Sequence, residues 1–459
     1  MRNNPKNYYI CAEESKFFLG AFFASLSSAF VCMEKLYHYL WKTGLRGAAF
    51  RDVDGAEVEV LDPGLHNHDS GPDFFNSKLK INGEEWVGNV EIHVKASDWY
   101  RHGHDDDPAY DNVILHVVGV SDKRITRADG SVIPQIEFTF PEKFFSTYLF
   151  LSDENKNVRC GSLLASVPDL NKTDWLETLA VERMQQKAAK VREILDITCG
   201  DWEQTCFIML SRGLGFGLNG DPFEMLGKSL PLRILHHHSD NPFQIEALMF
   251  GQAAMLDATM YMFDEYFQGL CREYYFLARK YGLKPLRPGL WKYSRTRPQN
   301  FPHRRIAFLA NAAFGGFTLF SRLLENCHDA ESLIDIFDMR AEGYWRHHFS
   351  FDTDARDVPS ELSRASRILL VINVAVPLLY AYAASVGDIE MGERVVGLMM
   401  DLPAESNTLV KQWMGFGLEA RDASRSQALI HLRKEYCDKN KCIYCRFGHH
   451  FLRASAKQA

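Results

Sequence analysis

Residues 70–95 hold the densest set of reactive side chains in the sequence. Asp73 lies in the segment S-G-P-D-F, and Glu91, His93 and Lys95 follow in V-E-I-H-V-K. Because side chains alternate along a β-strand, Glu91, His93 and Lys95 are expected on one face. Carboxylates favour Mg²⁺ or Mn²⁺, and such an ion makes hydroxide available near neutral pH. The pattern predicts metal-dependent hydrolysis, in which Asp73 and Glu91 bind the ion while Lys95, assisted by His93, positions the attacking water.

The same pattern resembles the PD-(D/E)xK nuclease core, which implies a phosphodiester substrate and a sheet like that of restriction endonucleases. The family's strand motif is a carboxylate, any residue and a lysine, whereas this strand has Glu91-x-His93-x-Lys95. Either His93 stands at the lysine position, or it replaces the carboxylate ahead of Lys95. The family follows this strand with a full helix, but here only 16 residues precede the next predicted strand at Asn112. A further carboxylate could come from Glu34 on the first helix, or from Glu57 or Glu59 on one face of the first strand.

Two His-x-His pairs flank this strand and allow a different metal chemistry. His66 and His68 precede the S-G-P-D-F segment, and His102 and His104 follow the strand. Imidazole nitrogens bind zinc, iron or manganese, so a histidine-rich site of cupin type is an alternative. Two plainer interpretations also stand. These loops are polar turns, and the Glu, His and Lys of the strand form a solvated face with cross-strand pairs.

A basic segment runs from Arg272 to Arg305, where ten Lys or Arg accompany one acid, Glu273. Arginine grips phosphates and aromatic rings stack on bases, so the segment predicts contact with nucleic acid, DNA in preference to RNA. The candidate residues are Trp291, Lys292, Arg295, Arg297, Arg304 and Arg305. The alternative is an internal strut, wedged between helices by its prolines and aromatic residues.

The C-terminal tail contains three cysteines in the spacing C-x4-C-x2-C, followed by a histidine. Three thiolates and an imidazole can close a tetrahedral zinc site. The spacing also suits an iron-sulfur cluster, whose fourth ligand would be a distant cysteine such as Cys160 or Cys199. The candidate ligands are Cys437, Cys442, Cys445 and His449. The alternative is a set of unliganded thiols held reduced.

The segments that must position these residues change in character along the chain. A short helix is expected at 34–42, followed by strands at 56–61, 74–81, 85–95, 112–120 and 132–140. Asn82-Gly83 is typical of a two-residue hairpin turn, so its flanking strands should pair antiparallel. Beyond Cys160 the apolar spacing predicts helices at 169–195, 202–213, 242–256, 263–281, 303–324, 360–385, 391–402 and 424–437.

These elements predict an α+β protein with two main parts. A mixed-sheet domain is expected at 33–160 and a mostly helical domain, carrying the cysteine motif, at 161–459. Met33 begins M-E-K-L-Y-H-Y-L-W, a natural start for a folded domain. Residues 1–32 are therefore interpreted as an extension that comes from a misassigned start codon.

Composition limits the class of protein. With 459 residues, 46% of them apolar, the chain is long enough for two or three cores, which excludes disorder as its main state. The net charge of -7 is mild, so any basic surface must be local. Ten cysteines, mostly without paired spacing, favour a reducing cytoplasm. The uncharged stretch 17–32 is short for a membrane span, and no membrane association is predicted.

Five blocks of sequence carry a second resemblance. They are M-E-K-L-Y-H-Y-L-W, S-G-P-D-F through E-I-H-V-K-A-S-D-W, A-Y-D-N-V-I-L-H-V-V, R-T-R-P-Q-N-F-P-H-R-R-I-A and Y-C-D-K-N-K-C-I-Y-C-R-F-G. Together they resemble an uncharacterised bacterial family of unknown function, number 2851, which implies a bacterial cytosolic setting but no activity. The residues themselves predict a metal-dependent nuclease or related phosphodiesterase. The alternative is a non-catalytic nucleic-acid-binding or adaptor protein with a degenerate nuclease fold.

Overall fold

The structure is a computed structural model in which the chain forms two compact units. It describes residues 33–34, 36–42, 49–67, 69–127, 129–138, 142–152, 158–294, 296–356 and 358–456. One unit comprises the chain up to Ser152 together with Cys442–Ala459, and the other comprises Asp153–Lys441. The predicted N-terminal extension, residues 1–32, lies outside the described residues.

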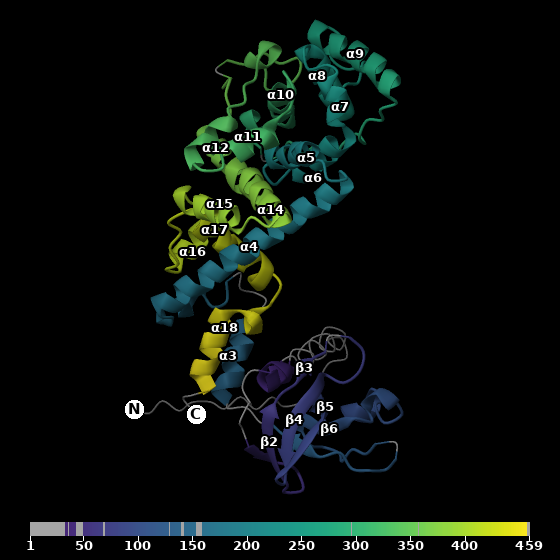
Figure 1. The fold of residues 1–459 in the computed structure, drawn as a ribbon, viewed down its shortest axis with the longest axis vertical. Helices are drawn as coiled ribbons and strands as arrows, with labels where there is room; N and C mark the ends of the chain where they lie inside the picture. The colour runs from purple at the N-terminus through teal and green to yellow at the C-terminus, as the bar shows by residue number, and fades with distance from the viewer. Residues whose placement is uncertain are drawn as a thin grey trace, which may run out of the picture. The chain divides into compact units, whose positions relative to one another are not determined.

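The first unit is built on one mixed sheet of seven strands (Figure 1). The strands are β1 (Ala49–Arg51), β2 (Glu57–Asp62), β3 (Leu65–His66), β4 (Phe74–Ile81), β5 (Glu84–Lys95), β6 (Val113–Val120) and β7 (Gln135–Glu137). Their order is β1-β2-β4-β5-β6-β7, with β3 paired to β4. The strands from β1 to β5 pair antiparallel, whereas β5–β6 and β6–β7 are parallel. The predicted mixed sheet followed by a mostly helical region is therefore confirmed.

The β4–β5 hairpin forms as its turn residues predict. Asn82 and Gly83 have φ values of 51° and 88°, as a type I′ turn requires. The strands on either side pair with Ile81 opposite Glu84 and Phe74 opposite Val90. This register places the start of β4 beside the second half of β5, where the candidate acids lie.

The two faces of the sheet are covered differently. A helical segment at 36–42 buries Tyr37 and Trp41 against a core that includes Val90, Ile92 and Val94 of β5. The helix lies so close that a Cβ on Gly119 would stand 2.1 Å from the Tyr37 hydroxyl. Because side chains alternate, Glu91 and His93 must point to the opposite face of the sheet.

That opposite face is covered by the connection between β5 and β6. Parallel neighbours cannot be joined by a hairpin, so the chain crosses back over the sheet. The crossover contains α2 (Asp98–Arg101) and a 3₁₀ turn, η1 (Pro108–Tyr110). Trp99 and Tyr110 from the crossover form a small core with Val113, Ile125 and Ile133. The crossover thus forms a lid of aromatic and polar side chains over Glu91 and His93.

The first unit also contains the end of the chain. After β7 comes α3 (Glu142–Ser152), which packs against the last helix, α18 (Arg446–Ala456). The 3₁₀ turn η7 (Cys442–Tyr444) precedes α18, and a Cβ on Gly448 would stand 2.0 Å from the Cys442 carbonyl oxygen. Residues 442–459 are thus grouped with the sheet unit, instead of with the helical domain to which the sequence analysis assigned them.

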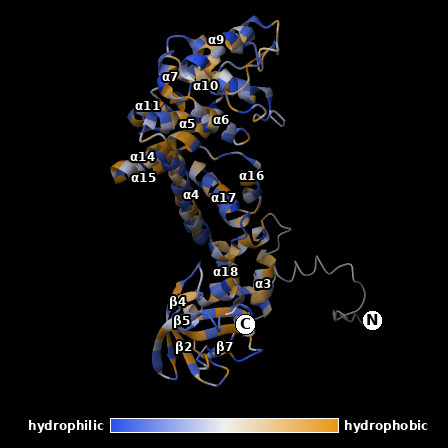
Figure 2. Ribbon diagram, turned by 90° about the vertical axis from the view of Figure 1, so that its right-hand side faces the viewer, coloured by the Kyte–Doolittle hydropathy of each residue, from blue (hydrophilic) through white to orange (hydrophobic). Residues whose placement is uncertain are grey.

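The second unit is helical and has its own large apolar core. Its α-helices are α4 (Asp169–Ile197), α5 (Trp202–Leu214), α6 (Gly220–Ser229), α7 (Leu232–His236), α8 (Pro242–Gln252), α9 (Glu265–Tyr281), α10 (Pro302–Ala313), α11 (Leu319–Glu325), α12 (Ala330–Ile336), α13 (Arg364–Leu370), α14 (Val376–Val386), α15 (Ile389–Asp401), α16 (Thr408–Gly415) and α17 (Ala423–His431). Figure 2 shows hydrophilic and hydrophobic residues alternating along these helices, as amphipathic helices require. The predicted helix at 303–324 is broken between α10 and α11, where Gly315 and Gly316 both have positive φ.

One stretch among the described helices, Arg364–Val386, is long and apolar enough to cross a membrane by length and composition. It comprises α13, the π-helical turn η5 (Val371–Ala375) and α14. The most apolar window is 61% buried within the protein. Such burial is typical of a core helix, so this stretch is weak evidence for a membrane span.

The pH dependence of stability should report a buried acid in the helical unit. The Tyr266 hydroxyl donates to Glu246, and burial raises the pKa of Glu246 to about 7. The folded state therefore favours the protonated form of Glu246, which adds to the free energy of unfolding. This stabilisation is complete at a pH below the pKa that Glu246 has in the unfolded chain, and it is lost as the pH rises through 7. Between pH 5 and pH 8 the free energy of unfolding of the wild type should fall because Glu246 ionises. We expect this fall to be smaller in Glu246→Gln, by up to about 3 kcal/mol.

Denaturant unfolding at the two pH values measures this effect. Glu393→Gln makes the same chemical change at an exposed position on α15 and should leave the pH dependence as in the wild type. Equal pH dependence in the wild type and Glu246→Gln would contradict the assignment.

Candidate metal centre

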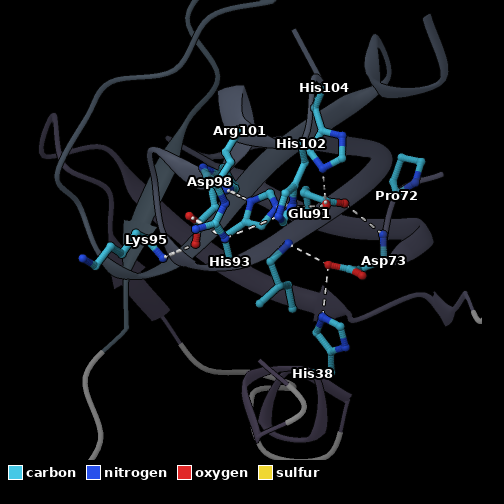
Figure 3. Close-up of polar contacts among 12 residues, drawn as sticks. His38, Pro72, Asp73, Glu91, His93, Lys95, Asp98, Arg101, His102 and His104 are labelled. Atoms are coloured by element: carbon cyan, nitrogen blue, oxygen red, sulfur yellow. Dashed lines mark hydrogen bonds and ion pairs between the residues drawn. The ribbon is translucent and has the colours of Figure 1, made fainter. Parts of the chain in front are cut away.

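Asp73 and Glu91 meet beside the start of β4, at the end of the hairpin away from its turn. The backbone N–H of Asp73 donates to Glu91 Oε2 at 3.1 Å, and Asp73 Oδ2 accepts from the N–H of Ile92 at 2.9 Å. The Asp73 side chain thus continues the β4–β5 hydrogen bonding beyond the end of β4. His38, from the helical segment, lies 3.1 Å from the same Oδ2 through its Nε2 (Figure 3). The two predicted acids are therefore held side by side.

Three histidines gather around Glu91. His93 comes from β5, and His102 and His104 come from the crossover. One ligand nitrogen from each of the three lies within 4.8 Å of the other two. His93 is buried, His104 is half-buried and His102 is exposed, so the group opens to solvent on one side.

Three of the separations among these ligand atoms match the edges of a tetrahedron around one ion. His93 Nε2 lies 3.1 Å from His102 Nδ1 and 3.5 Å from Glu91 Oε1, and His104 Nε2 lies 3.3 Å from the same oxygen. Ligands about 2.0–2.1 Å from a tetrahedral Zn²⁺ stand about 3.4 Å apart. Three imidazoles and one carboxylate could therefore bind a single ion with little rearrangement.

A buried hydrogen-bond chain sets the tautomer of His93. The amide nitrogen of Gln135 donates to Ser121 Oγ at 2.6 Å, which leaves Gln135 Oε1 as the acceptor facing His116 Nδ1 at 3.3 Å. His116 Nε2 must then accept from His93 Nδ1, 2.8 Å away. His93 consequently presents the lone pair of Nε2 to the site. Metal-binding histidines commonly have such a partner on the other ring nitrogen.

Burial sets the charge of the site. It holds the pKa of His93 well below its usual range, helped by the neighbouring His116, His102 and His104. It lowers the pKa of His104 and of His116 to about 4. Burial and the adjacent Asp73 charge raise the pKa of Glu91 well above its usual value. At neutral pH these imidazoles are uncharged and able to donate lone pairs, while the carboxylate lacks a positive partner.

Aromatic packing holds the crossover histidines in place. His104 stacks on Tyr110 with ring centroids 3.8 Å apart and meets Trp99 edge-on at 5.4 Å. Trp99 also packs against His116, at 5.5 Å. The His-Gly-His spacing suits this arrangement because Gly103 adopts a φ of 74°, a conformation in which glycine is favoured.

Lys95 does not reach the carboxylates. Its side chain is exposed and points away from Asp73 and Glu91 in Figure 3. Its backbone N–H donates to Asp98 Oδ2 at 3.3 Å, and its charge acts on Asp122. Lys95 shares a strand face with Glu91, as predicted, but it stands at the end of β5, where a long cation can extend into solvent. The structure brings together Asp73, Glu91 and His93 without Lys95.

Of the two His-x-His pairs that the sequence analysis considered, the structure brings one pair to the site. His102 and His104 join His93, whereas His66 stacks on Phe74 with centroids 4.8 Å apart. His68 lies outside the described residues. Glu34 lies near enough for His38 and Asp73 to act on its pKa, which burial raises. The carboxylate and histidine hypotheses therefore describe one site instead of two.

A family model described as protein of unknown function (DUF2851) matches residues 34–408. The chain belongs to this family. No curated protein and no solved structure matches the chain. The matched span contains the sheet site and the basic segment, and it ends before the cysteine-rich tail. The predicted family is confirmed by this match.

The basic segment divides into buried and exposed residues. Lys292 and Arg297 are exposed, and Arg295 lies outside the described residues. Trp291 is buried and donates from Nε1 to the Ala253 carbonyl at 2.8 Å, and Arg304 and Arg305 are buried as well. Buried side chains cannot grip a polymer across an open surface. For these three, the internal-strut interpretation fits the structure.

The tail cysteines lie around the end of the helical unit and the start of α18. Cys437 ends the π-helical turn η6 (Leu432–Cys437), whereas Cys442, Cys445 and His449 belong to the sheet unit. Within that unit the Cys445 N–H donates to the Cys442 carbonyl at 3.2 Å, and the His449 N–H donates to the Cys445 carbonyl at 2.9 Å. The zinc or iron-sulfur site at these residues stays a prediction.

Sequence analysis missed His116 and Gln135. His116 lies within the run V-I-L-H-V-V, which is typical of a buried strand, and Gln135 lies in a strand of three residues. The available signal was the single histidine in an otherwise apolar strand, since a buried histidine needs a partner. Finding that partner requires the parallel register in which Glu91 faces His116 and His116 faces Gln135.

Removing His116, which binds His93 but is not itself a candidate ligand, should weaken metal binding. In His116→Phe the His93 Nδ1 proton loses its acceptor, and His93 can adopt the other tautomer. We expect about a tenfold to hundredfold loss of Zn²⁺ or Co²⁺ affinity, measured by competition with a chelator. His303→Phe removes a buried histidine of lowered pKa in the helical unit and is the matched control. Equal affinity in both variants would show that the hydrogen-bond chain does not orient His93.

Proposed function

We propose that this protein is a metal-dependent phosphodiesterase, most simply a nuclease, whose ion is bound by His93, His102, His104 and Glu91. The observation that carries the proposal is the gathering of three imidazole nitrogens, all within 4.8 Å of one another, and one carboxylate oxygen, with three of the separations at 3.1–3.5 Å. A divalent ion there would bring a bound water close to its deprotonation at neutral pH and would polarise a phosphoryl oxygen.

The donor set favours a different ion from the one that the two acids alone suggest. Mg²⁺ prefers oxygen ligands, whereas imidazole suits Zn²⁺, Mn²⁺ and Fe²⁺. Three imidazoles with one carboxylate support Zn²⁺ or Mn²⁺ in preference to Mg²⁺. Exposed His102 marks the side from which a substrate oxygen or a water could complete the coordination.

Asp73 and His38 supply the groups for proton transfer in this proposal. The carboxylate of Asp73 accepts from the Ile92 N–H and lies 3.1 Å from His38 Nε2, and the Asp73 N–H donates to Glu91. A pair of a carboxylate and an imidazole beside the ion can accept the proton of the attacking water. His38 then takes the part that the sequence analysis gave to Lys95.

The substrate class comes from the resemblance to the PD-(D/E)xK core. In support, an antiparallel hairpin bears Asp73 and Glu91, and β6 joins it in parallel after a crossover. Exposed Lys292 and Arg297 of the basic segment are available to contact phosphates. We propose nucleic acid, DNA in preference to RNA, as the substrate.

A non-catalytic nucleic-acid-binding or adaptor protein remains the second candidate. The observation that favours it is Lys95, which points away from the acids and leaves the usual lysine position of the nuclease motif unfilled. In that case the histidine cluster would bind metal for structural reasons. Such a protein would bind nucleic acid and metal but would cleave nothing.

Cleavage of single- and double-stranded DNA and RNA with Mg²⁺, Mn²⁺, Zn²⁺ or Co²⁺ tests the proposal. We expect activity with Mn²⁺, Zn²⁺ or Co²⁺, and at least about a hundredfold loss in Glu91→Gln and in His104→Ala. Lys95→Ala is the matched control on the same strand face, and its rate should stay within about threefold of the wild type.

Each outcome decides between the candidates. Metal binding without cleavage of any substrate would favour the non-catalytic protein. Cleavage that survives Glu91→Gln and His104→Ala would overturn the proposed site. A loss in Lys95→Ala as large as that in Glu91→Gln would restore the lysine-dependent mechanism and remove the role given to His38.

A further inference from the structure

The helical unit contains a cavity of about 510 Å³ that is lined by two adjacent arginines of α10, Arg304 and Arg305. Other lining residues come from the loop between α5 and α6 and from the segment before α13. Cavities of this size accommodate small organic ligands. The cavity lies wholly within the helical unit and is separate from the candidate metal centre.

Both arginines are almost completely buried. Arg304 is 1% exposed and Arg305 is 4% exposed. Arg304 donates to the backbone carbonyls of Trp345 and Pro359, whereas Arg305 donates to Asn300 Oδ1. Nε and one terminal nitrogen of Arg305 have no hydrogen-bond partner, and neither does Nε of Arg304. Unsatisfied charged donors in the interior are costly.

No acid compensates these two charges among the described residues. The carboxylate that lines the cavity, Glu361, lies 3.2 Å from Arg340 and 3.9 Å from Arg367. Arg305 instead stacks 4.4 Å from the ring of Phe216. Burial lowers the pKa of both Arg304 and Arg305 to about 10, so both remain charged at neutral pH.

The loop facing the arginines is rich in glycine. It has the sequence G-F-G-L-N-G from Gly215 to Gly220, and it leads directly into α6. A Cβ on Gly215 would stand 2.5 Å from the backbone of Asn219 and Gly220, so the tight turn requires glycine there. Asn219 bonds in both directions with the backbone of Lys292, which ties the loop to the basic segment. The N–H groups of Gly215, Phe216 and Asn219 already donate to backbone carbonyls nearby, so the loop forms a fixed wall of the cavity and the arginines supply the donors for an anion.

We propose that this cavity binds a small phosphate-bearing molecule, with its phosphate against Arg305 and Arg304 and its organic part in the remaining space. A phosphate monoester carries close to two negative charges and can neutralise two guanidinium groups, whereas a carboxylate neutralises one. The unpartnered nitrogens of Arg305 are covered in this structure, so the phosphate would accept from them after a shift of the guanidinium group toward the cavity. This site does not depend on the proposed metal chemistry, because its arginines lie in the helical unit; Arg297, which the proposed function places against phosphates, also lines the cavity.

Thermal unfolding and isothermal calorimetry of the full chain test the site. The probes are inorganic phosphate and a nucleoside monophosphate, each compared with chloride at matched ionic strength. We expect saturable binding and a raised unfolding temperature in the wild type. Arg305→Gln should weaken binding at least tenfold while raising the unfolding temperature without ligand, because it removes an uncompensated buried charge.

Two further variants make the result interpretable. Arg279→Gln removes an exposed arginine of α9 and should bind the probes as the wild type does. Arg305→Lys keeps the positive charge but loses the planar guanidinium group, and it replaces Arg305→Gln if that variant does not fold. Its affinity for the probes should lie between those of the wild type and Arg305→Gln. Binding that is absent from the wild type, or unchanged in Arg305→Gln or Arg305→Lys, would overturn the proposal. A nucleoside monophosphate that binds more tightly than inorganic phosphate would assign the remaining space to an organic group.

Discussion

Parallel pairing of β5 with β6 is the constraint on which the candidate metal centre depends. A hairpin cannot join parallel neighbours, so residues 96–112 must cross back over one face of the sheet. That crossing places His102 and His104 above Glu91 and His93. The same pairing sets His116 beside Glu91 in register, within 2.8 Å of His93 Nδ1. Backbone topology therefore assembles donors from β5 and from the crossover that follows it, and aromatic packing by Trp99 and Tyr110 holds them there.

Burial has the same kind of effect on the candidate metal centre and on the arginine cavity, but the buried charge is negative in the first and positive in the second. Burial penalises whichever form of a group is charged. Around Glu91 it leaves neutral imidazoles and an acid of raised pKa, a combination that a divalent cation would relieve. In the helical unit it leaves two guanidinium groups, whose charge cannot be removed at neutral pH and which an anion would relieve. Each unit thus contains buried charged or titratable groups whose burial is costly.

Local signals predicted the sheet but only part of the site. Alternation of apolar residues and the Asn82-Gly83 turn were sufficient for β4 and β5, because strand period and turn type are properties of neighbouring residues. Strand period also placed Glu91, His93 and Lys95 on one face correctly. Strand period could not show that Glu91 is buried and Lys95 is exposed, because the residues that bury Glu91 belong to the crossover. His116 and Gln135 were missed for a related reason, because their value depends on the register between strands.

The buried arginines show that the composition of a segment does not predict whether its charged residues lie on the surface. A segment with ten cations predicts a phosphate-binding surface, but Arg304 and Arg305 are buried on α10, whereas Lys292 and Arg297 are exposed. All residues of α10 from Arg304 to Ala310 are buried, so the helix is covered on every side and its arginines cannot reach the surface. Arg304 satisfies part of its donor set with backbone carbonyls, which a surface arginine would not need. In the proposed site, phosphate recognition would therefore take place in the interior of this segment, where shape as well as charge selects the ligand.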